Sequence, residues 1–257
     1  MPLRKPVFAG SFYPASKQLC ERLLDSFRLA PNPKAKAVVS PHAGWVYSGN
    51  TAARAIEALE CGGTVAVLSP NHAGAGKPVS VSKSDWLTPL GVMKTDLGAA
   101  EKLVGAGFEF DEEAHAREHS VEVQLPFLQR VFPGARLVAV TIGDQSLETA
   151  VKLGEALAEL NVCVVASSDF THYEAAEKAK RKDDAAVKAL ESLGVEKFFE
   201  ALRENECSAC GFGPIAAAAT FAEKKGAKKA RVIDYSNSGE KTRDYSSVVN
   251  YYAIEFS

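Results

Sequence analysis

Three apolar runs in the chain share one design, in which a short polar turn follows the run and delivers a histidine. Their composition and shortness predict buried strands. The runs and their histidines are residues 37–39 with His42, residues 64–69 with His72, and residues 162–167 with His172. Ligands of open α/β sheets bind in the crevice beyond the carboxyl ends of the strands. The pattern therefore predicts three imidazoles near such a crevice.

The rest of the chain alternates between helical and extended patterns at the spacing of βαβ units. Helical periodicity predicts helices over residues 17–29, 50–59, 96–104, 119–132 (begun or kinked at Pro126), 146–160, 174–193, 195–204 and 214–224. Further strands are predicted over residues 79–81, 135–142, 230–235 and 248–256, with a hairpin within 85–94. Since no Gly/Ser/Pro linker divides the chain, we expect a single three-layer α/β domain over residues 1–257. Its sheet should be largely parallel or mixed, with helices on both faces.

Composition excludes several classes of function. The chain has 257 residues, 46% of them apolar, and a net charge of −2, which gives no general attraction to nucleic acid or to an anionic membrane. No apolar run approaches the roughly 18 residues that span a bilayer, and the N-terminal sequence lacks an apolar signal core. The five cysteines are odd in number and widely spread. We therefore expect reduced thiols and a cytoplasmic location.

The histidines are first candidates for metal ligands, because neutral imidazole is the commonest protein ligand of late first-row metals. Two histidines with one anionic ligand would form a facial triad suited to Fe(II) and O₂. Position alone does not choose the third ligand, which the sequence leaves open among Glu118, Glu122, Asp169, Cys207 and Cys210. The alternative for any single histidine is a hydrogen-bonded structural role.

Two other motifs carry weaker signals. Residues 115–119 match H-x-x-E-H, which would make His115, Glu118 and His119 a zinc hydrolase site, although acidic residues before the motif indicate an exposed turn. Cys207 and Cys210 form C-x-x-C, but late in the chain, where a thioredoxin-like dithiol is not expected. A single reactive or ligating thiol at Cys210 is more plausible, because the N-terminus of a following helix favours thiolate. Nucleotide-binding and serine-nucleophile motifs are absent from the sequence.

Six blocks, read together, resemble the Memo family, whose prokaryotic members are also called AmmeMemoRadiSam system protein B. They are AGSFYPA (9–15), PHAGWVYSG (41–49), SPNHAG (69–74), EHSVEVQLPFL (118–128), SSDFTHY (167–173) and ACGFGPI (209–215). The blocks run through nearly the whole chain in the family's order. The resemblance implies a fold like that of class III extradiol non-haem iron dioxygenases.

The resemblance also implies roles for individual residues. It places His42 and His72 at the two metal-histidine positions and Cys210 where the dioxygenases keep a glutamate. It puts His172 at the position of the catalytic base, with Asp169 close by to orient His172 or a bound water, and His119 in the same crevice as a further catalytic group. Because thiolate is softer than carboxylate, the implied site shifts toward copper, zinc or thiolate-tolerant iron, and iron or copper is expected in preference to zinc.

The main hypothesis is a metal-dependent, dioxygenase-like redox enzyme that acts on a small organic substrate. Phe12, Tyr13, Trp45 and Tyr47 are expected either to line the substrate pocket or to pack in the core. The alternative is a non-catalytic module that binds a metal or a peptide in the same crevice. By the family name, AMMECR1-type and radical-SAM proteins are the expected partners, and neither nucleic acid nor membrane is expected.

Overall fold

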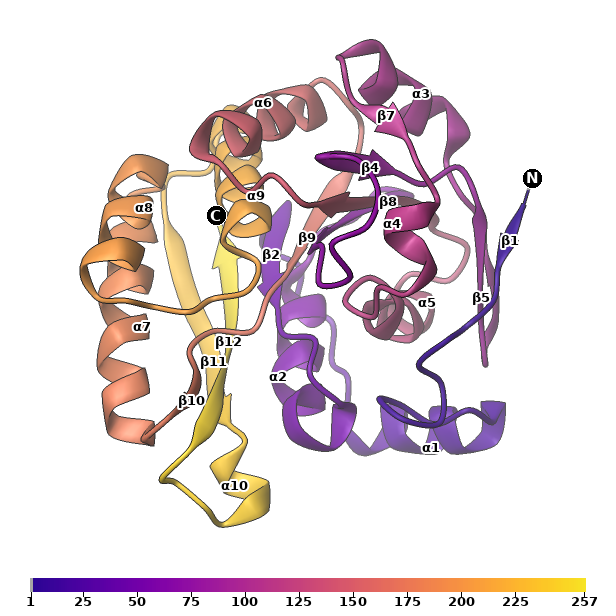
Figure 1. The fold of residues 1–257 in the computed structure, drawn as a ribbon. Helices are drawn as coiled ribbons and strands as arrows, with labels where there is room; N and C mark the ends of the chain where they lie inside the picture. The colour runs from indigo at the N-terminus through magenta and orange to yellow at the C-terminus, as the bar shows by residue number, and fades with distance from the viewer. Residues whose placement is uncertain (1) are drawn as a thin grey trace.

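Four parallel strands form the centre of the molecule in the computed structural model, which describes residues 2–257 (Figure 1). They lie in the order β2 (Ala37–Ser40), β9 (Cys163–Ser167), β3 (Thr64–Pro70) and β8 (Arg136–Ile142). Ser40 pairs with Ser167, so the carboxyl ends of β2 and β9 are level. The strands expected from the apolar runs are thus confirmed.

The sheet is mixed, as expected. Antiparallel strands extend it at both sides, so that nine strands join within residues 2–257 in the order β10-β12-β2-β9-β3-β8-β4-β7, with β11 on β12. The outer strands are β4 (Val79–Val81), β7 (Glu109–Phe110), β10 (His172–Glu174), β11 (Ala230–Asn237) and β12 (Val248–Phe256). A small second sheet joins β1 (Leu3–Arg4), β5 (Asp85–Thr88) and β6 (Gly91–Met93), and the last two form the expected hairpin.

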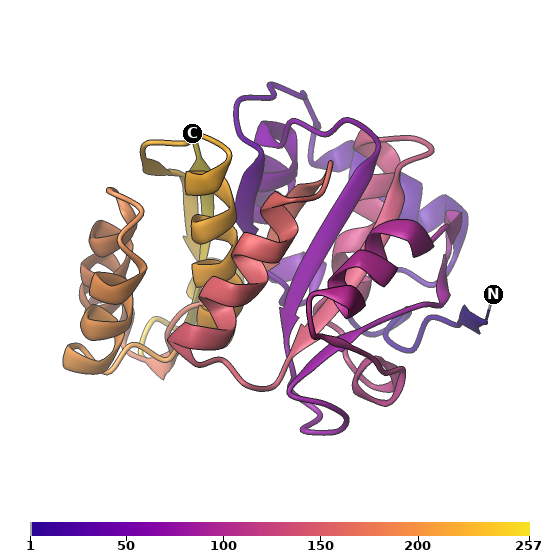
Figure 2. The same ribbon diagram turned by 90° about the horizontal axis from the view of Figure 1, so that it is seen from above.

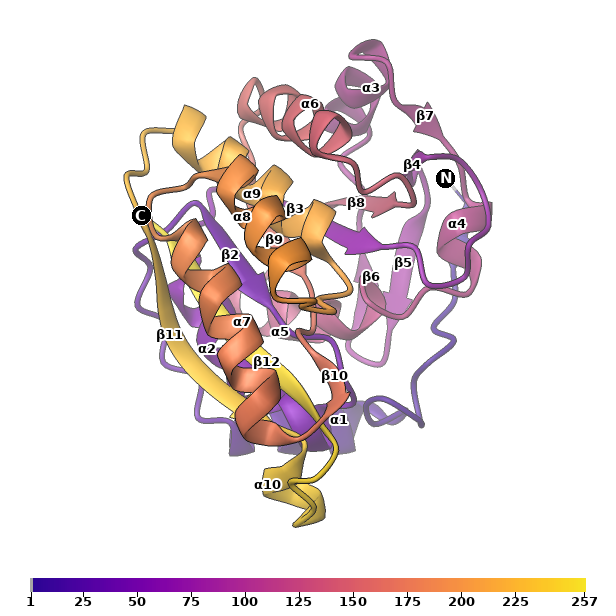
Figure 3. The same ribbon diagram turned by 60° about the vertical axis from the view of Figure 1, so that its left-hand side comes forward.

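Helices cover both faces of the sheet, which makes three layers (Figures 2 and 3). Val38 and Val165 face a core shared with α1 (Lys17–Ser26), α2 (Trp45–Ala58) and α5 (Leu125–Val131). Val39 and Ala166, one residue on, face the opposite core. That core is shared with α3 (Leu97–Gly105), α6 (Leu147–Ala158), α7 (Ala176–Leu190), α8 (Val195–Glu204) and α9 (Phe212–Lys224). This alternation is what a strand buried on both faces requires.

Short helical segments complete the chain: α4 (Glu113–Ala116), α10 (Gly239–Thr242) and a 3₁₀ turn at Glu122–Gln124. Helix α2 begins at Trp45, five residues before its expected start, because the Trp45 N–H donates to the carbonyl of Phe12 and fixes the first turn. Helix α5 begins beside Pro126, as expected. None of the helices among the described residues is long and apolar enough to cross a membrane.

One expectation about the cysteines is wrong. Cys61 and Cys163 form a disulfide, with Cα atoms 5.3 Å apart, although they are separated by 102 positions in sequence. The parallel pairing of β3 with β9 brings Val65 opposite Cys163, and Cys61 lies just before β3. Neither the count nor the spacing of the cysteines reveals a contact made by strand pairing.

Candidate metal centre

Three histidines converge beyond the carboxyl ends of the central strands. His42 follows β2, His72 follows β3, and His119 comes from the segment between α4 and the 3₁₀ turn. One ligand atom from each ring lies within 4.8 Å of those of the other two. Their ring centroids are 4.7 to 5.2 Å apart. Two strand-end histidines therefore meet as expected, and the third member of the group is His119.

A buried network fixes the tautomer of His42. The Ser167 hydroxyl donates its single proton to the carbonyl of Ser120 at 2.7 Å, so it must accept from Nδ1–H of His42 at 3.0 Å. The Gln124 amide also donates to Ser167 at 3.0 Å and reaches the carbonyl of Pro41 at 2.9 Å, which ties the ends of β2 and β9 together. Nε2 of His42 is consequently the acceptor nitrogen of the ring, and it lies 3.2 Å from the Cys210 sulfur.

Glu118 fixes the tautomer of His72, as Ser167 does for His42. Its carboxylate accepts Nδ1–H of His72 at 2.9 Å and the backbone N–H of His72 at 2.7 Å. Burial of Glu118 by itself would raise its pKa, but the bonds from His72 and Ser120 outweigh burial and lower the pKa to about 2. Glu118 is therefore charged at neutral pH. A charged carboxylate behind a histidine orients the ring and makes Nε2 a stronger ligand.

His119 lies between two rings, with its centroid 4.6 Å from Phe12 and 4.7 Å from His72. Its Nδ1 is 3.4 Å from a Glu118 oxygen. Burial lowers the pKa of His119 to about 4. The pKa of His42 is lowered well below its ordinary value, mainly by burial and further by the neighbouring histidines. These two imidazoles are thus neutral at pH 7, which is the form that binds a metal.

Cys210, expected as a metal ligand, lies beside this group rather than in it. Its Sγ is 3.2 Å from Nε2 of His42 and accepts the backbone N–H of Asp169 at 3.3 Å. Gly211 permits this approach, since a Cβ there would lie 2.5 Å from the carbonyl oxygen of Ser167. Burial, reinforced by the charge of Asp169, raises the pKa of the Cys210 thiol. Burial therefore overrides the thiolate-favouring helix end that the sequence suggested.

Asp169 orients His42 rather than His172. Its Oδ1 accepts the backbone N–H of His42 at 2.8 Å. Burial raises the pKa of Asp169 to about 7, although hydrogen bonds from the backbone of His42 and Ala43 oppose the shift. The carboxylate thereby fixes the turn that carries His42.

His172 is half-buried and held by Ser208. The Ser208 hydroxyl accepts the backbone N–H of His172 at 3.0 Å, and Nδ1 of His172 lies 3.2 Å from the Ser208 carbonyl oxygen. Because a carbonyl can only accept, Nδ1 carries the proton and Nε2 remains an acceptor. Burial lowers the pKa of His172, and nearby His72 contributes to this shift. The ring is therefore a neutral base near the three-histidine group.

The H-x-x-E-H motif does not form one site. His115 is fully buried, with its two ring nitrogens bound to the Thr141 hydroxyl at 3.0 Å and the Ser80 carbonyl at 3.1 Å. It is thus a structural residue, and the hydrolase alternative loses its first ligand. The C-x-x-C pair also separates, because the Cys207 thiol donates to Asp183 at 3.0 Å while Cys210 faces His42.

The four aromatic residues expected at a pocket have different positions. Phe12 packs on His119, and Tyr47 is exposed on the first turn of α2. Trp45 is buried 4.5 Å from the ring of Phe127, and Tyr13 is buried with its hydroxyl on Glu122 at 2.8 Å. Tyr13 and Trp45 therefore belong to the core, which was the alternative interpretation for these residues.

Sequence reasoning missed Ser167, Ser120 and Gln124, and named Glu118 as one of several ligand candidates and as part of the hydrolase motif, but not as the partner of His72. The Ser-Ser-Asp turn after β9 is visible in the sequence, but nothing there shows which histidine its hydroxyl bonds.

Comparisons with known proteins identify the family of the chain. The family profile described as Memo-like protein matches residues 4–255. A MEMO1 family protein of Methanosarcina barkeri is 40% identical over 262 residues, covering 98% of this chain and 99% of that protein. One of Aquifex aeolicus is 40% identical over 267 residues, covering all of both chains. A crystal structure of an uncharacterized Escherichia coli K12 protein shares the fold at 14% identity, with a TM-score of 0.56 over 86% of this chain and 99% of that one. The chain belongs to the Memo family.

Proposed function

We propose that this protein is a metal-dependent redox enzyme whose single metal ion is held by His42, His72 and His119. The observation that carries the proposal is the convergence of three imidazole ligand atoms within 4.8 Å of one another. Partners behind the rings support it, since Ser167 and Glu118 each bind an Nδ1–H and leave Nε2 as the unprotonated nitrogen of the ring. Such partners are typical of metal-binding histidines.

The donor set favours iron or copper. Neutral nitrogen donors suit both ions, and a sulfur beside His42 adds a soft donor that Cys210 can bring in if its proton leaves. Either ion would supply one-electron and O₂ chemistry when bound. The high pKa of the Cys210 thiol means that recruitment of this sulfur releases a proton at neutral pH.

His172 is the proposed acid–base residue. Its neutral Nε2 can accept a proton from a bound substrate, while the carbonyl of Ser208 holds Nδ1–H and fixes the ring. Asp169 contributes by fixing the backbone at His42, and Phe12 shields one face of His119. A small organic substrate would then meet the exposed side of His72, whose side chain is 35% accessible.

The test is O₂ consumption by iron- or copper-loaded protein with ascorbate as reductant, alone and with a panel of ortho-diphenols. Catalytic uptake that His119→Ala abolishes, and that His172→Ala slows without loss of metal, would support the enzyme. Tight metal binding with no turnover would overturn the redox proposal and favour the metal-binding module.

Partnership with AMMECR1-type and radical-SAM proteins is a proposal that rests on the family resemblance, and a cytoplasmic location is a separate proposal. Co-elution of the purified components in size-exclusion chromatography tests the partnership, and independent elution would contradict it.

A further inference from the structure

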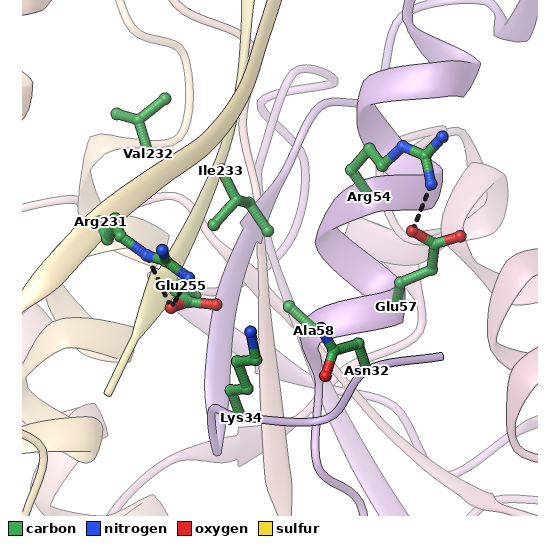
Figure 4. Close-up of a pocket in the computed structure, with 9 residues that line it drawn as sticks. All are labelled: Asn32, Lys34, Arg54, Glu57, Ala58, Arg231, Val232, Ile233 and Glu255. Atoms are coloured by element: carbon green, nitrogen blue, oxygen red, sulfur yellow. Dashed lines mark hydrogen bonds and ion pairs between the residues drawn. The ribbon is translucent and has the colours of Figure 1, made fainter. Parts of the chain in front are cut away.

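A second pocket lies at the far end of helix α2 from the metal centre. The helix begins just after His42, and its last residue, Ala58, lines this pocket. Fourteen residues of helix separate the two ends by about 21 Å. The pocket has a volume of about 300 Å³ and is bounded on its other side by β11 and the end of β12 (Figure 4). It is therefore separate from the site that holds the histidines.

Two buried carboxylates flank the pocket, each joined to an arginine. Glu57 is 6% exposed and accepts Nη1–H of Arg54 at 2.8 Å, and its other oxygen accepts the backbone N–H of Ala30. Glu255 is 3% exposed and receives both Nε–H and Nη2–H of Arg231 on the single oxygen Oε1, at 3.0 and 2.8 Å. Buried charges are costly unless they are paired. Each carboxylate thus fixes one guanidinium at the pocket wall.

Two groups of opposite charge remain free in the space between these pairs. Within residues 2–257 the Lys34 ammonium has no ion-pair partner, since the nearby acids Glu57, Glu60 and Glu255 are engaged by other cations. Oε2 of Glu255 likewise has no hydrogen-bond partner among these residues, because Arg231 binds only Oε1. Figure 4 shows this oxygen directed toward the space beside Lys34.

The pocket also offers an apolar surface. Ile233 and Ala58 lie between the two Arg–Glu pairs, and Ile233 belongs to the strand segment where the β11–β12 register shifts. A free cation, a free carboxylate oxygen and an apolar wall thus meet in one small cavity. A purely anionic ligand would meet Oε2 of Glu255, the oxygen that Arg231 does not bind, and a purely cationic one would meet Lys34 and the arginines. The combination favours a ligand that carries both charges.

We propose that this pocket binds a free α-amino acid with a small apolar side chain. Its carboxylate would pair with Lys34, its ammonium with Oε2 of Glu255, and its side chain would rest on Ile233 and Ala58. The volume lies at the lower end of the range for small-molecule sites and suits a compact ligand. The proposal does not depend on the metal centre or on its chemistry.

Isothermal titration calorimetry with L-valine at constant ionic strength tests whether the pocket binds an amino acid. Isobutylamine and isovalerate each lack one of the two charged groups and serve as ligand controls. We expect saturable binding of one valine per chain, weakened about tenfold or more in each control ligand, because a charged contact is lost. Lys34→Gln should weaken valine binding similarly. Lys241→Gln removes an exposed lysine that does not line the pocket and forms no ion pair within residues 2–257, and it should leave binding unchanged.

The absence of saturable valine binding would overturn the proposal. So would equal binding of isovalerate or isobutylamine, which would show that one charge suffices. Valine binding that survives Lys34→Gln would place the ligand elsewhere, including at the metal centre. Circular dichroism of both variants confirms that each remains folded, which is expected because Lys34 and Lys241 are surface residues.

Discussion

Replacement of Glu118 by Gln tests how the centre is built. The Glu118 carboxylate accepts four hydrogen bonds, two from His72 and two from Ser120, and none of its oxygens is exposed. A glutamine can present one oxygen to Nδ1–H of His72, but its amide N–H₂ must then face the backbone N–H of the same residue. Two donors would oppose each other, and His72 would lose both its charged partner and its fixed orientation.

The expected effect is a loss of metal affinity of about 10- to 100-fold, or about 1.4 to 2.7 kcal/mol. The assay is competition for Zn²⁺ and Cu⁺ between the metal-free protein and a chromophoric chelator at pH 7. Glu122→Gln is the matched control, since Glu122 is equally buried but binds Arg4 and Tyr13 instead of a histidine. Unchanged affinity in folded Glu118→Gln protein, or an equal loss in Glu122→Gln, would refute the reasoning.

Three further predictions concern stability. Asp96 caps α3 and accepts a hydrogen bond from Thr64. Burial would raise the pKa of Asp96, but these bonds lower it below its ordinary value. Asp96→Ala should therefore lower the free energy of unfolding by about 1 kcal/mol above pH 4, and this difference should vanish as the pH falls below about 3.9. Urea denaturation at several pH values measures this, and a pH-independent difference would contradict it. Gly154→Ala should destabilise the protein by about 1–3 kcal/mol, because the added Cβ would lie 2.5 Å from the carbonyl oxygen of Ala217. Gly105 has open space around it, so Gly105→Ala should be neutral or slightly stabilising. Equal thermal shifts in the two glycine variants would be the contrary result. His115→Ala should lower the melting temperature but leave metal stoichiometry unchanged, and loss of metal from folded protein would revive the hydrolase interpretation.

The fold was predictable because its strands are strongly patterned. The run at 64–69 is apolar and ends in Ser-Pro, and the structure has a strand from Thr64 to Pro70. Helices α3 and α6 begin where the sequence predicts them, at the N-caps Asp96 and Ser146, because capping chemistry is local. The strand order was not predictable, since pairing across the sheet depends on contacts between distant segments. The Cys61–Cys163 disulfide follows from that order.

Part of the site was also predictable from the strongly patterned strands. His42 and His72 follow strands, so their convergence could be inferred from the pattern. His119 follows no strand, and its place depends on how the segment before α5 crosses the crevice. The roles of Ser167 and Glu118 depend on side-chain directions, which a single sequence does not contain. Cys210 could be placed near His42, but its protonation depends on burial that becomes visible in three dimensions.

The most direct test of the central claim is the metal content of anaerobically purified protein after titration with iron and copper, compared among three variants. The account predicts one ion per chain in the unaltered protein, loss of that ion in His119→Ala, and retention in His172→Ala, because His172 lies outside the group of three. Cys210→Ser should retain the ion with weakened affinity. An unaltered protein that takes up no metal, or a His119→Ala variant that binds it as tightly, would contradict the account.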